Sequence, residues 1–303
     1  MYYHDLNSEL RARFGCKLYK LALPGGSTCP NRDGRCGTRG CIFCDGAGAF
    51  AAQGGTVQEQ LALAKARVAA KAGPGAGYIA YFQSFTATYA PVAELERRFT
   101  AALRDPEVQM LSIATRPDCL PDEVVRLLET LRQEKPVMVE LGLQTIHEET
   151  ARFLRRGYAL PVFDEAMQRL RQAGLETVVH LILGLPGESA QDMQESAAYA
   201  GRAGADGVKL HLLHVLRGTD LAALYQERPF PLPSLPEYTL LLERCLEVLP
   251  RSVVIHRLTG DGAKRDLIAP VWSADKKRVL NAIQAAFRRD NLEQGCRAAQ
   301  IRT

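Results

Sequence analysis

Four of the eight cysteines of the chain lie close together, at Cys29, Cys36, Cys41 and Cys44. Three of them follow the spacing C-x11-C-x2-C, and Cys36 falls inside the long gap. Clustered thiols can hold a structural zinc ion, form disulfides, or bind an iron–sulfur cluster through three thiolates that leave one iron open. A second C-x-x-C pair with zinc-ribbon spacing does not follow in the sequence. The loop by itself therefore leaves zinc and iron–sulfur chemistry as equal alternatives.

The composition and the apolar segments of the chain indicate the cellular compartment of the protein. The chain has 303 residues, 47% of them apolar and 24% charged, which is typical of a globular protein. A net charge of +4 permits an anionic partner such as RNA without requiring one. The N-terminal stretch lacks the apolar core of a secretory signal, and the apolar run 178–185 is too short for a bilayer. We therefore expect a cytoplasmic protein with no membrane partner and with reduced thiols, which disfavours disulfides.

Short apolar runs alternate with amphipathic segments along most of the chain. The runs predict strands at 17–23, 78–83, 110–115, 137–144, 177–185, 207–216 and 253–258. The segments predict helices at 56–72, 91–104, 121–133, 161–173, 188–203 and 236–249. This alternation indicates an α/β fold with a parallel sheet, as in a full or partial (β/α) barrel, with a doubly wound sheet as the alternative. The cysteine loop directly follows the first strand, at the end where barrels bind cofactors.

Proline and glycine residues mark the expected ends of these elements. Pro91, Pro121 and Pro161 lie at helix starts, and Gly174 and Gly204 lie where helices should end. The proline-rich stretch 226–236 cannot continue a helix or a strand and predicts a linker. We therefore predict a barrel that includes the cysteine loop over residues 1–225 and an extension packed on it over residues 226–303.

Longer segments of the chain resemble the radical S-adenosylmethionine (SAM) superfamily. They are KLYKLALPGGSTCPNRDG, GCIFC, AYFQSFTATYAP, LSIATRPDCL, VELGLQTIHEETARFLRRGY, HLILGLPGES, LHLLHVLRGTDLA, VIHRLTGD and APVWSADKKRVLNAI. Within the superfamily, the sequence is similar to the YhcC/YtqA-like family, which is related to the elongator catalytic subunit. The resemblance implies a partial (β/α)6-type TIM barrel with a C-terminal α/β extension. It also implies a [4Fe-4S] cluster on Cys29, Cys41 and Cys44, with Cys36 left as a bystander.

The resemblance further implies a SAM site at the ends of the strands. Phe43, just before the last cysteine, would offer an apolar shelf for adenine. Thr86 matches the polar residue of the superfamily's glycine-rich segment near the methionine amino group. Gln144 and Arg156 match a SAM-binding pair of the anaerobic coproporphyrinogen oxidases. His180 stands where those relatives have an aspartate near the ribose, and Gly184 would let the backbone pass close to the adenine.

Further residues are expected to line a substrate pocket. Glu140 alternates with Gly142 and Gln144, so the three share one face of a strand, which we expect to face the barrel interior. A buried acid on that face would need a partner. The remaining candidates for the pocket lie at or near the ends of other strands and are Arg116, Lys209, His211 and His256.

The resemblance implies the reaction class. A reduced cluster would cleave SAM to methionine and a 5′-deoxyadenosyl radical, which would abstract hydrogen from a substrate. An electron donor such as a flavodoxin or a ferredoxin is then a partner. The elongator relationship implies tRNA, in particular the side chain of a wobble uridine, and the basic segment 276–289 could meet its phosphates. The alternatives are a radical SAM enzyme that acts on a small metabolite and a zinc-stabilised, non-catalytic RNA-binding protein.

Overall fold

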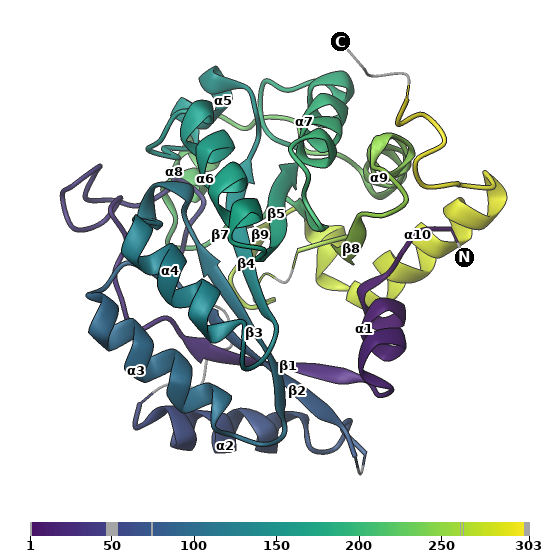
Figure 1. Cartoon of the computed structure of the whole chain (residues 1–303). Coiled ribbons are helices and arrows are strands. Elements are labelled where there is room, and N and C mark those ends of the chain that lie inside the picture. The colour runs from purple at the N-terminus through teal and green to yellow at the C-terminus, as the bar shows by residue number, and fades with distance from the viewer. Residues whose placement is uncertain (1, 47–53, 74, 261, 263, 300–303) are drawn as a thin grey trace.

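A seven-stranded parallel sheet, curled into an open barrel, forms the centre of the computed structural model (Figure 1). The structure describes residues 2–46, 54–73, 75–260, 262 and 264–299. The strands follow the chain order, β1-β2-β3-β4-β5-β6-β8. Their bounds are β1 Leu18–Pro24, β2 Gly77–Gln83, β3 Val108–Thr115, β4 Val137–Gln144, β5 Glu176–Leu183, β6 Gly207–Leu212 and β8 Val254–Arg257. The partial barrel expected from the sequence is confirmed, and the doubly wound sheet is wrong.

Helices cover the outer face of this sheet. They include α2 Val57–Val68, α3 Val92–Leu103, α4 Asp122–Leu131, α6 Leu160–Gln172, α7 Ala190–Arg202 and α9 Leu235–Val248. The outward side chains of the strands pack with them in one large apolar core. Pro91 and Pro121 are N-caps as predicted, and Gly174 and Gly204 have left-handed φ angles of 64° and 82° just past α6 and α7. Local signals and tertiary packing therefore agree on these boundaries.

The inner face of the sheet is built in layers, as is usual for a barrel. Apolar side chains close the bottom of the barrel and pack against α1 (Leu6–Phe14), namely Leu18, Ile79, Met110, Met138 and Val178. Two residues further along each strand, the side chains on the same face form a polar layer. This layer consists of Lys20, Tyr81, Ser112, Glu140, His180 and Lys209. Above it follow small residues such as Ala22, Ala114 and Gly142. Because these are small, they leave room at the carboxyl ends of the strands.

The C-terminal part of the chain contributes to the same sheet. β8 pairs in parallel with β6, so the sheet draws its seventh strand from beyond residue 225. The division of the chain at that residue stays a prediction. A single strand over 207–216 is wrong, because β6 ends at Leu212 and a short β7 (Val215–Leu216) pairs antiparallel with β9 (Leu267–Ala269). The remaining helices are α5 Glu148–Phe153, α8 Asp220–Glu227 and α10 Lys276–Arg289, together with the 3-10 turns Pro117–Cys119 and Val271–Ala274.

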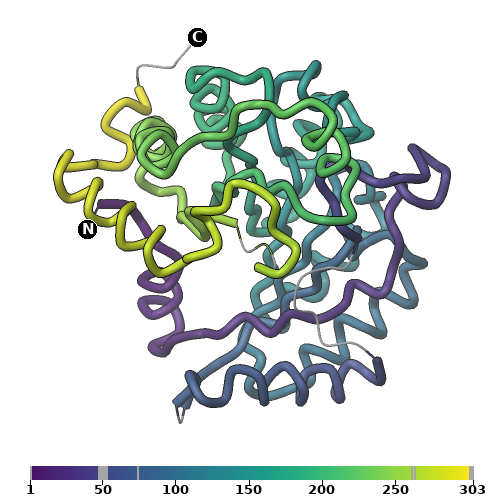
Figure 2. Tube along the Cα trace, turned by 180° about the vertical axis from the view of Figure 1, so that it is seen from behind, coloured from purple at the N-terminus to yellow at the C-terminus, as the bar shows by residue number. Residues whose placement is uncertain are grey.

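The N-terminal residues lie beside the C-terminal helices (Figure 2). The His4 amide donates to Gln294 Oε1 at 2.8 Å, and the Gln294 amide donates to the Tyr2 carbonyl at 3.1 Å. Asp5 forms an isolated bridge with Ile255 of β8. These contacts tie the start of the chain to the seventh strand. Within the described part of the chain, the search for a helix of sufficient length and apolar character to span a membrane found none.

Candidate active site

A cavity of about 200 Å³ opens at the carboxyl ends of the strands, under the loop that carries the cysteines. This cysteine loop comprises residues 28–44. Ten of the fourteen residues predicted for the site line the cavity, namely Cys29, Cys41, Phe43, Cys44, Thr86, Arg116, Glu140, Gln144, Arg156 and His180. Cys36 is exposed and does not line it. The structure therefore brings together the thiols and the polar strand ends that the sequence separates.

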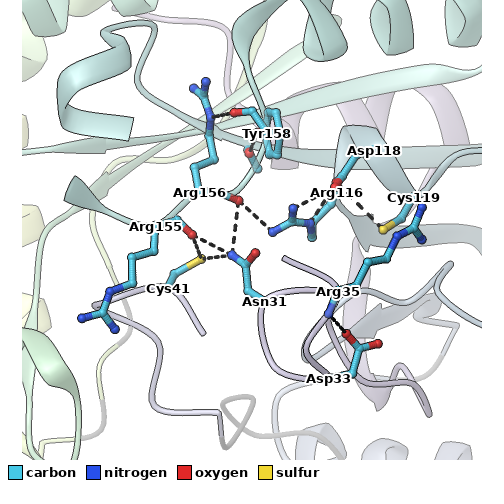
Figure 3. A network of polar contacts seen from close by, with 11 residues as sticks. Asn31, Asp33, Arg35, Cys41, Arg116, Asp118, Cys119, Arg155, Arg156 and Tyr158 are labelled. Carbon is cyan, nitrogen blue, oxygen red and sulfur yellow. Dashed lines mark hydrogen bonds and ion pairs between the residues drawn. The ribbon is translucent and has the colours of Figure 1, made fainter. Parts of the chain in front are cut away.

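Asn31 fixes the cysteine loop to the segment that follows α5 (Figure 3). Its side-chain amide is 2.7 Å from the Arg155 carbonyl, 3.2 Å from the Arg156 carbonyl and 3.3 Å from Cys41 Sγ. The Ile42 amide adds a backbone bond to the Leu154 carbonyl at 3.1 Å. Since Asn31 is buried, these bonds define where the thiol of Cys41 lies.

Arg32 anchors the other end of the same loop. Its guanidinium donates to the Cys44 carbonyl at 2.9 Å and lies over the ring of Phe85 at 5.6 Å. The Cys44 amide donates to the Cys41 carbonyl at 3.0 Å, which closes a tight turn between the two cysteines. Both thiols of the C-x-x-C pair are thus presented to the cavity by a loop whose backbone is held at two points.

The thiols are not arranged as a zinc site would need. Among the described residues, groups of three or more His, Cys, Asp or Glu ligand atoms within 4.8 Å of one another occur only at His147, Asp192 and Glu195. A tetrahedral zinc site would hold its sulfur atoms about 3.8 Å apart, given Zn–S bonds near 2.3 Å. Burial, reinforced by the neighbouring Cys44, raises the pKa of Cys41 to about 11, so the thiolate forms only with a strong positive partner. Among the described residues, the thiols as they stand are therefore not gathered into a closed zinc site.

Thr86 provides an independent indication that the cavity receives a ligand. Its side chain is fully buried, and its Oγ1 has no hydrogen-bond partner. Buried hydroxyl groups are nearly always paired, so an unpaired one that lines a cavity calls for an explanation. Two residues later, Thr88 bonds Thr115 Oγ1 and the Cys119 carbonyl, each at 2.5 Å. Unlike the hydroxyl of Thr88, the hydroxyl of Thr86 is therefore available to a polar group outside the chain.

Arg156 is more firmly held than a free ligand-binding arginine would be. Its guanidinium donates to the carbonyls of Tyr158 at 3.0 Å, Leu143 at 3.3 Å and Thr145 at 2.7 Å, and to Glu148 Oε1 at 3.0 Å. A guanidinium group has five N–H donors, so these four hydrogen bonds leave one N–H for a ligand. Gln144, by contrast, has a left-handed φ of 68° and makes no side-chain hydrogen bond among the described residues. Of this predicted pair, Gln144 is therefore the freer donor.

Arg116 stabilises the wall between the cysteine loop and the strand ends (Figure 3). It forms a two-point pair with Asp118, at 2.9 and 2.8 Å, and donates to the Arg156 carbonyl at 2.8 Å. The Tyr158 ring lies between the two guanidinium groups, 5.4 Å from that of Arg116 and 4.6 Å from that of Arg156. This stack holds positive charge beside the cavity.

Glu140 forms the floor of the cavity and accepts four hydrogen bonds. Ser112 and Lys20 donate to Oε1 at 2.6 and 2.8 Å, and His180 Nε2 donates to Oε2 at 2.7 Å, where Lys209 also binds. Burial raises the pKa of Glu140, but Lys20 and Lys209 outweigh it and hold that pKa well below its usual range. The carboxylate is therefore ionised and saturated, and it cannot act as a base.

The pKa values of two basic neighbours of Glu140 are lowered as well. Burial, assisted by Lys209, lowers the pKa of His180 to about 4, so its ring is neutral. Because its Nε2 donates to a carboxylate, His180 presents Nδ1 as an acceptor. Burial also lowers the pKa of Lys209 to about 7 in spite of Glu140.

Four predicted site residues do not line the cavity. Lys209 lies in the polar layer beneath it, and the ring of His211 lies 5.2 Å from that of His180. His256, on β8, packs closely over Gly207 of β6. Gly184 has φ of 83°, and a Cβ there would lie 3.1 Å from Pro233, so this turn favours glycine; its contact with adenine stays a prediction.

Sequence reasoning missed Lys20, Asn31, Arg32 and Tyr158. The sequence does contain an indication for Lys20. A charged residue that shares a strand face with Leu18 and Ala22 needs a partner inside the barrel. The side chains of the other three donate to backbone carbonyls, and the sequence pattern does not specify where those carbonyls lie.

Comparison with known proteins found matching family models and similar sequences. Residues 32–200 match the model of the radical SAM superfamily, and residues 205–289 match that of the radical SAM C-terminal domain. YtqA of Bacillus subtilis is 41% identical over 296 residues, which cover 97% of this chain and 92% of that protein. A tRNA uridine(34) acetyltransferase of Methanocaldococcus jannaschii is 28% identical over 155 residues, 50% of this chain and 28% of that one.

A solved structure with the same fold is the archaeal Methanocaldococcus infernus Elp3 with an N-terminal deletion. It superposes with a TM-score of 0.69 at 17% identity, covering 91% of this chain, and this chain spans 64% of that one. At this identity the likeness concerns the fold, and it includes the open parallel barrel described above.

Proposed function

The chain belongs to the radical SAM superfamily, a superfamily of enzymes, and from this premise we propose that it uses a [4Fe-4S] cluster to cleave SAM reductively. Cys29, Cys41 and Cys44 would hold the cluster. When bound, the cluster and SAM supply a 5′-deoxyadenosyl radical for hydrogen abstraction from a substrate. The observation that carries the proposal is the convergence of these three thiols on the cavity that also contains the unpaired Thr86 hydroxyl.

The residues of the cavity would bind and orient SAM in distinct ways. Thr86 and Gln144 offer uncommitted polar groups for the methionine end. Arg156 adds one N–H and otherwise keeps the backbone of Leu143 and Thr145 in place. His180 offers an acceptor at Nδ1 that suits a ribose hydroxyl, and Phe43 offers an apolar face for adenine.

The enzyme would receive its electron from a small redox protein such as a flavodoxin or a ferredoxin, since radical SAM enzymes need a donor. Cys41 and Cys44 are partly exposed, so the cysteine loop lies near the protein surface. A short path from the surface to the cluster favours transfer from a docked partner.

Anaerobic purification tests the cofactor directly. We expect bound iron and sulfide, and slow formation of 5′-deoxyadenosine from SAM after reduction with dithionite. Cys41→Ala should abolish both signals, whereas the matched change Cys36→Ala should leave both largely intact. Protein that binds zinc and no iron after reconstitution would contradict the proposal and favour the zinc-stabilised alternative.

For the substrate, we propose the side chain of a wobble uridine in tRNA. Two features support this choice: a relative whose name specifies tRNA uridine(34), and the basic residues on α10. Lys276, Lys277, Arg278, Arg288 and Arg289 carry positive charge on this helix, while Val279, Ile283 and Phe287 bury its other face. Profiling tRNA nucleosides from cells with and without the protein tests this choice. Unchanged profiles would favour a small metabolite instead.

A further inference from the structure

A second cavity, of about 690 Å³, adjoins the candidate active site. Three segments of the chain contribute a pair of nearby residues, the first lining the candidate active site and the second lining the new cavity. The pairs are Arg32 and Arg35 of the cysteine loop, Thr86 and Thr88 after β2, and Arg116 and Asp118 after β3. Figure 3 shows Arg35 and Cys119 on the side of Arg116 that faces away from Cys41. The second cavity therefore lies behind a wall of the first, and its volume is that of a small-molecule site.

The walls of the second cavity are held in place by contacts within the protein. Pro117 and Cys119 are the buried ends of a 3-10 turn, and Thr88 Oγ1 donates to the Cys119 carbonyl at 2.5 Å. Asp118 is fixed by its two-point pair with Arg116. A cavity that is formed before its ligand arrives loses little side-chain freedom on binding. The second cavity is therefore preformed, as small-molecule sites usually are.

One part of the lining consists of flat, apolar side chains. Tyr89 is half-buried, and its hydroxyl is hydrogen-bonded by Asp33 and Arg35 of the cysteine loop, so the position of its ring is fixed. Three rigid proline rings line the same cavity, those of Pro91, Pro117 and Pro121. An aromatic ring offers a face on which another planar ring stacks. This part of the lining therefore suits a planar aromatic group.

The other part of the lining is charged. Arg35 is exposed, and its guanidinium lies 5.9 Å from the centre of the Tyr89 ring, so a cation stands beside the flat surface. Arg169 of α6 lines the cavity as well, and its pair with the exposed Asp122 is made through Nη2 alone of its three nitrogens. Guanidinium groups bind phosphate oxygens, and Glu165 of the same helix can accept a hydrogen bond from the amino group of a base. A stacking surface, phosphate donors and an acceptor for an amino group together match the chemistry of a nucleotide.

We propose that the second cavity binds a nucleotide whose base carries an amino group. The base would stack on Tyr89 and donate to Glu165, and the phosphate would accept hydrogen bonds from Arg35 and Arg169. Such a ligand would lie directly behind the wall of the candidate active site. The site goes beyond the proposed function, and only the assignment of the nucleotide to a tRNA substrate rests on that function. A free nucleotide is the other source of the same chemistry.

Calorimetric titration of the full chain with cytidine 5′-monophosphate (CMP) tests the site, because cytosine has an amino group and CMP lacks the adenine that the SAM site would accept. We expect saturable binding, at least about tenfold tighter than that of cytidine or of ribose 5-phosphate, each of which lacks one half of the ligand. Arg35→Met and Tyr89→Leu should each weaken the binding about tenfold. Arg104→Met is the control, since it removes an exposed charge at the opposite end of α3 from Pro91, and it should leave the binding unchanged.

Hydrogen exchange locates the bound nucleotide. CMP should protect the segment 117–121, whose residues line the second cavity and not the first. Protection of the segment 154–158 instead would place CMP in the candidate active site and overturn the inference. The inference is also overturned if CMP does not saturate below about 10 mM, or if Arg35→Met and Tyr89→Leu both bind it as the unaltered protein does.

Two further titrations identify the source of the nucleotide and separate this site from the radical chemistry. A single-stranded cytidylate tetramer that binds more tightly than CMP assigns the nucleotide to an RNA, whereas equal or weaker binding assigns it to a free nucleotide. CMP binding by protein that takes up no iron would retain the site and reject the radical SAM chemistry. Iron uptake and SAM cleavage without CMP binding would do the reverse, so the two failures are distinguishable.

Discussion

The cysteine loop and the polar layer face one cavity, yet they are built in opposite ways. The loop is held through its backbone by Asn31 and Arg32, and its thiols remain free to bind. The polar layer lies on strands, and its carboxylate, Glu140, is fully paired with other side chains. Under the proposed function, the first region is completed by an external group, whereas the second consists of side chains that already pair with one another. Changes in the loop should therefore affect cofactor retention, and changes in the layer should affect folding.

The largest effect is expected in the polar layer. Glu140→Gln leaves the buried amine of Lys209 and the partly exposed ammonium group of Lys20 without their anion, which should lower the free energy of unfolding by about 3–5 kcal/mol. The measurement is urea unfolding of iron-free protein. The control is Asp122→Asn, which breaks an exposed pair with Arg169 at 2.5 Å and should cost less than about 1 kcal/mol. Equal, small losses for the two variants would refute the assignment of the layer to folding.

In the cysteine loop, the corresponding change should act on the cofactor. Asn31→Ala removes the amide that contacts Cys41 Sγ and two carbonyls, so the thiol loses its fixed position. We expect iron retention to fall about 10–100-fold, as is typical when a partner of a metal ligand is lost. Chelator competition measures this, with exposed Asn7→Ala as the control. Unchanged retention would show that the loop needs no such anchor.

The same comparison explains what the sequence could and could not predict. The alternation of strands with helices located Gln144 and Arg116 at strand ends, because periodicity and chain order determine those positions. The pair of Lys20 with Glu140 joins residues 120 positions apart and depends on how the barrel closes. The role of Arg156 depends on the left-handed turn at Arg155, where φ is 56°. A pattern of residue types does not specify such a turn, so the backbone contacts of the Arg156 guanidinium could not be predicted from the sequence.

The pH dependence of stability should distinguish Lys209 from the rest of the layer. Its pKa of about 7 in the folded protein lies below the ordinary value of 10.5, so between the two the unfolded chain binds a proton that the native chain lacks. Stability should therefore rise with pH above about 7, by at most about 1.4 kcal/mol per unit. His180 and Tyr81 titrate outside this window.

Unfolding of the unaltered protein and of Lys209→Met, compared at about pH 7.5 and 8.5, isolates this contribution, because the other titrating groups cancel in the difference. The unaltered protein should gain more stability over that interval than the variant does. Identical gains would mean that Lys209 keeps its proton in the native state.

The smallest expected effect lies at Thr86, between the two regions, and it tests whether the cavity is made for a ligand. Thr86→Val removes an unpaired hydroxyl while keeping its shape, so the free energy of unfolding should stay the same or rise slightly. SAM affinity should fall about 2–10-fold, the equivalent of one hydrogen bond. Thr88→Val is the matched control. Because it breaks the hydrogen bonds to Thr115 and Cys119, it should lower the free energy of unfolding by about 1–3 kcal/mol. It should leave SAM affinity unchanged. If Thr86→Val destabilises the ligand-free protein as Thr88→Val does, the hydroxyl serves the fold, and the ligand-binding role of this wall of the cavity is refuted.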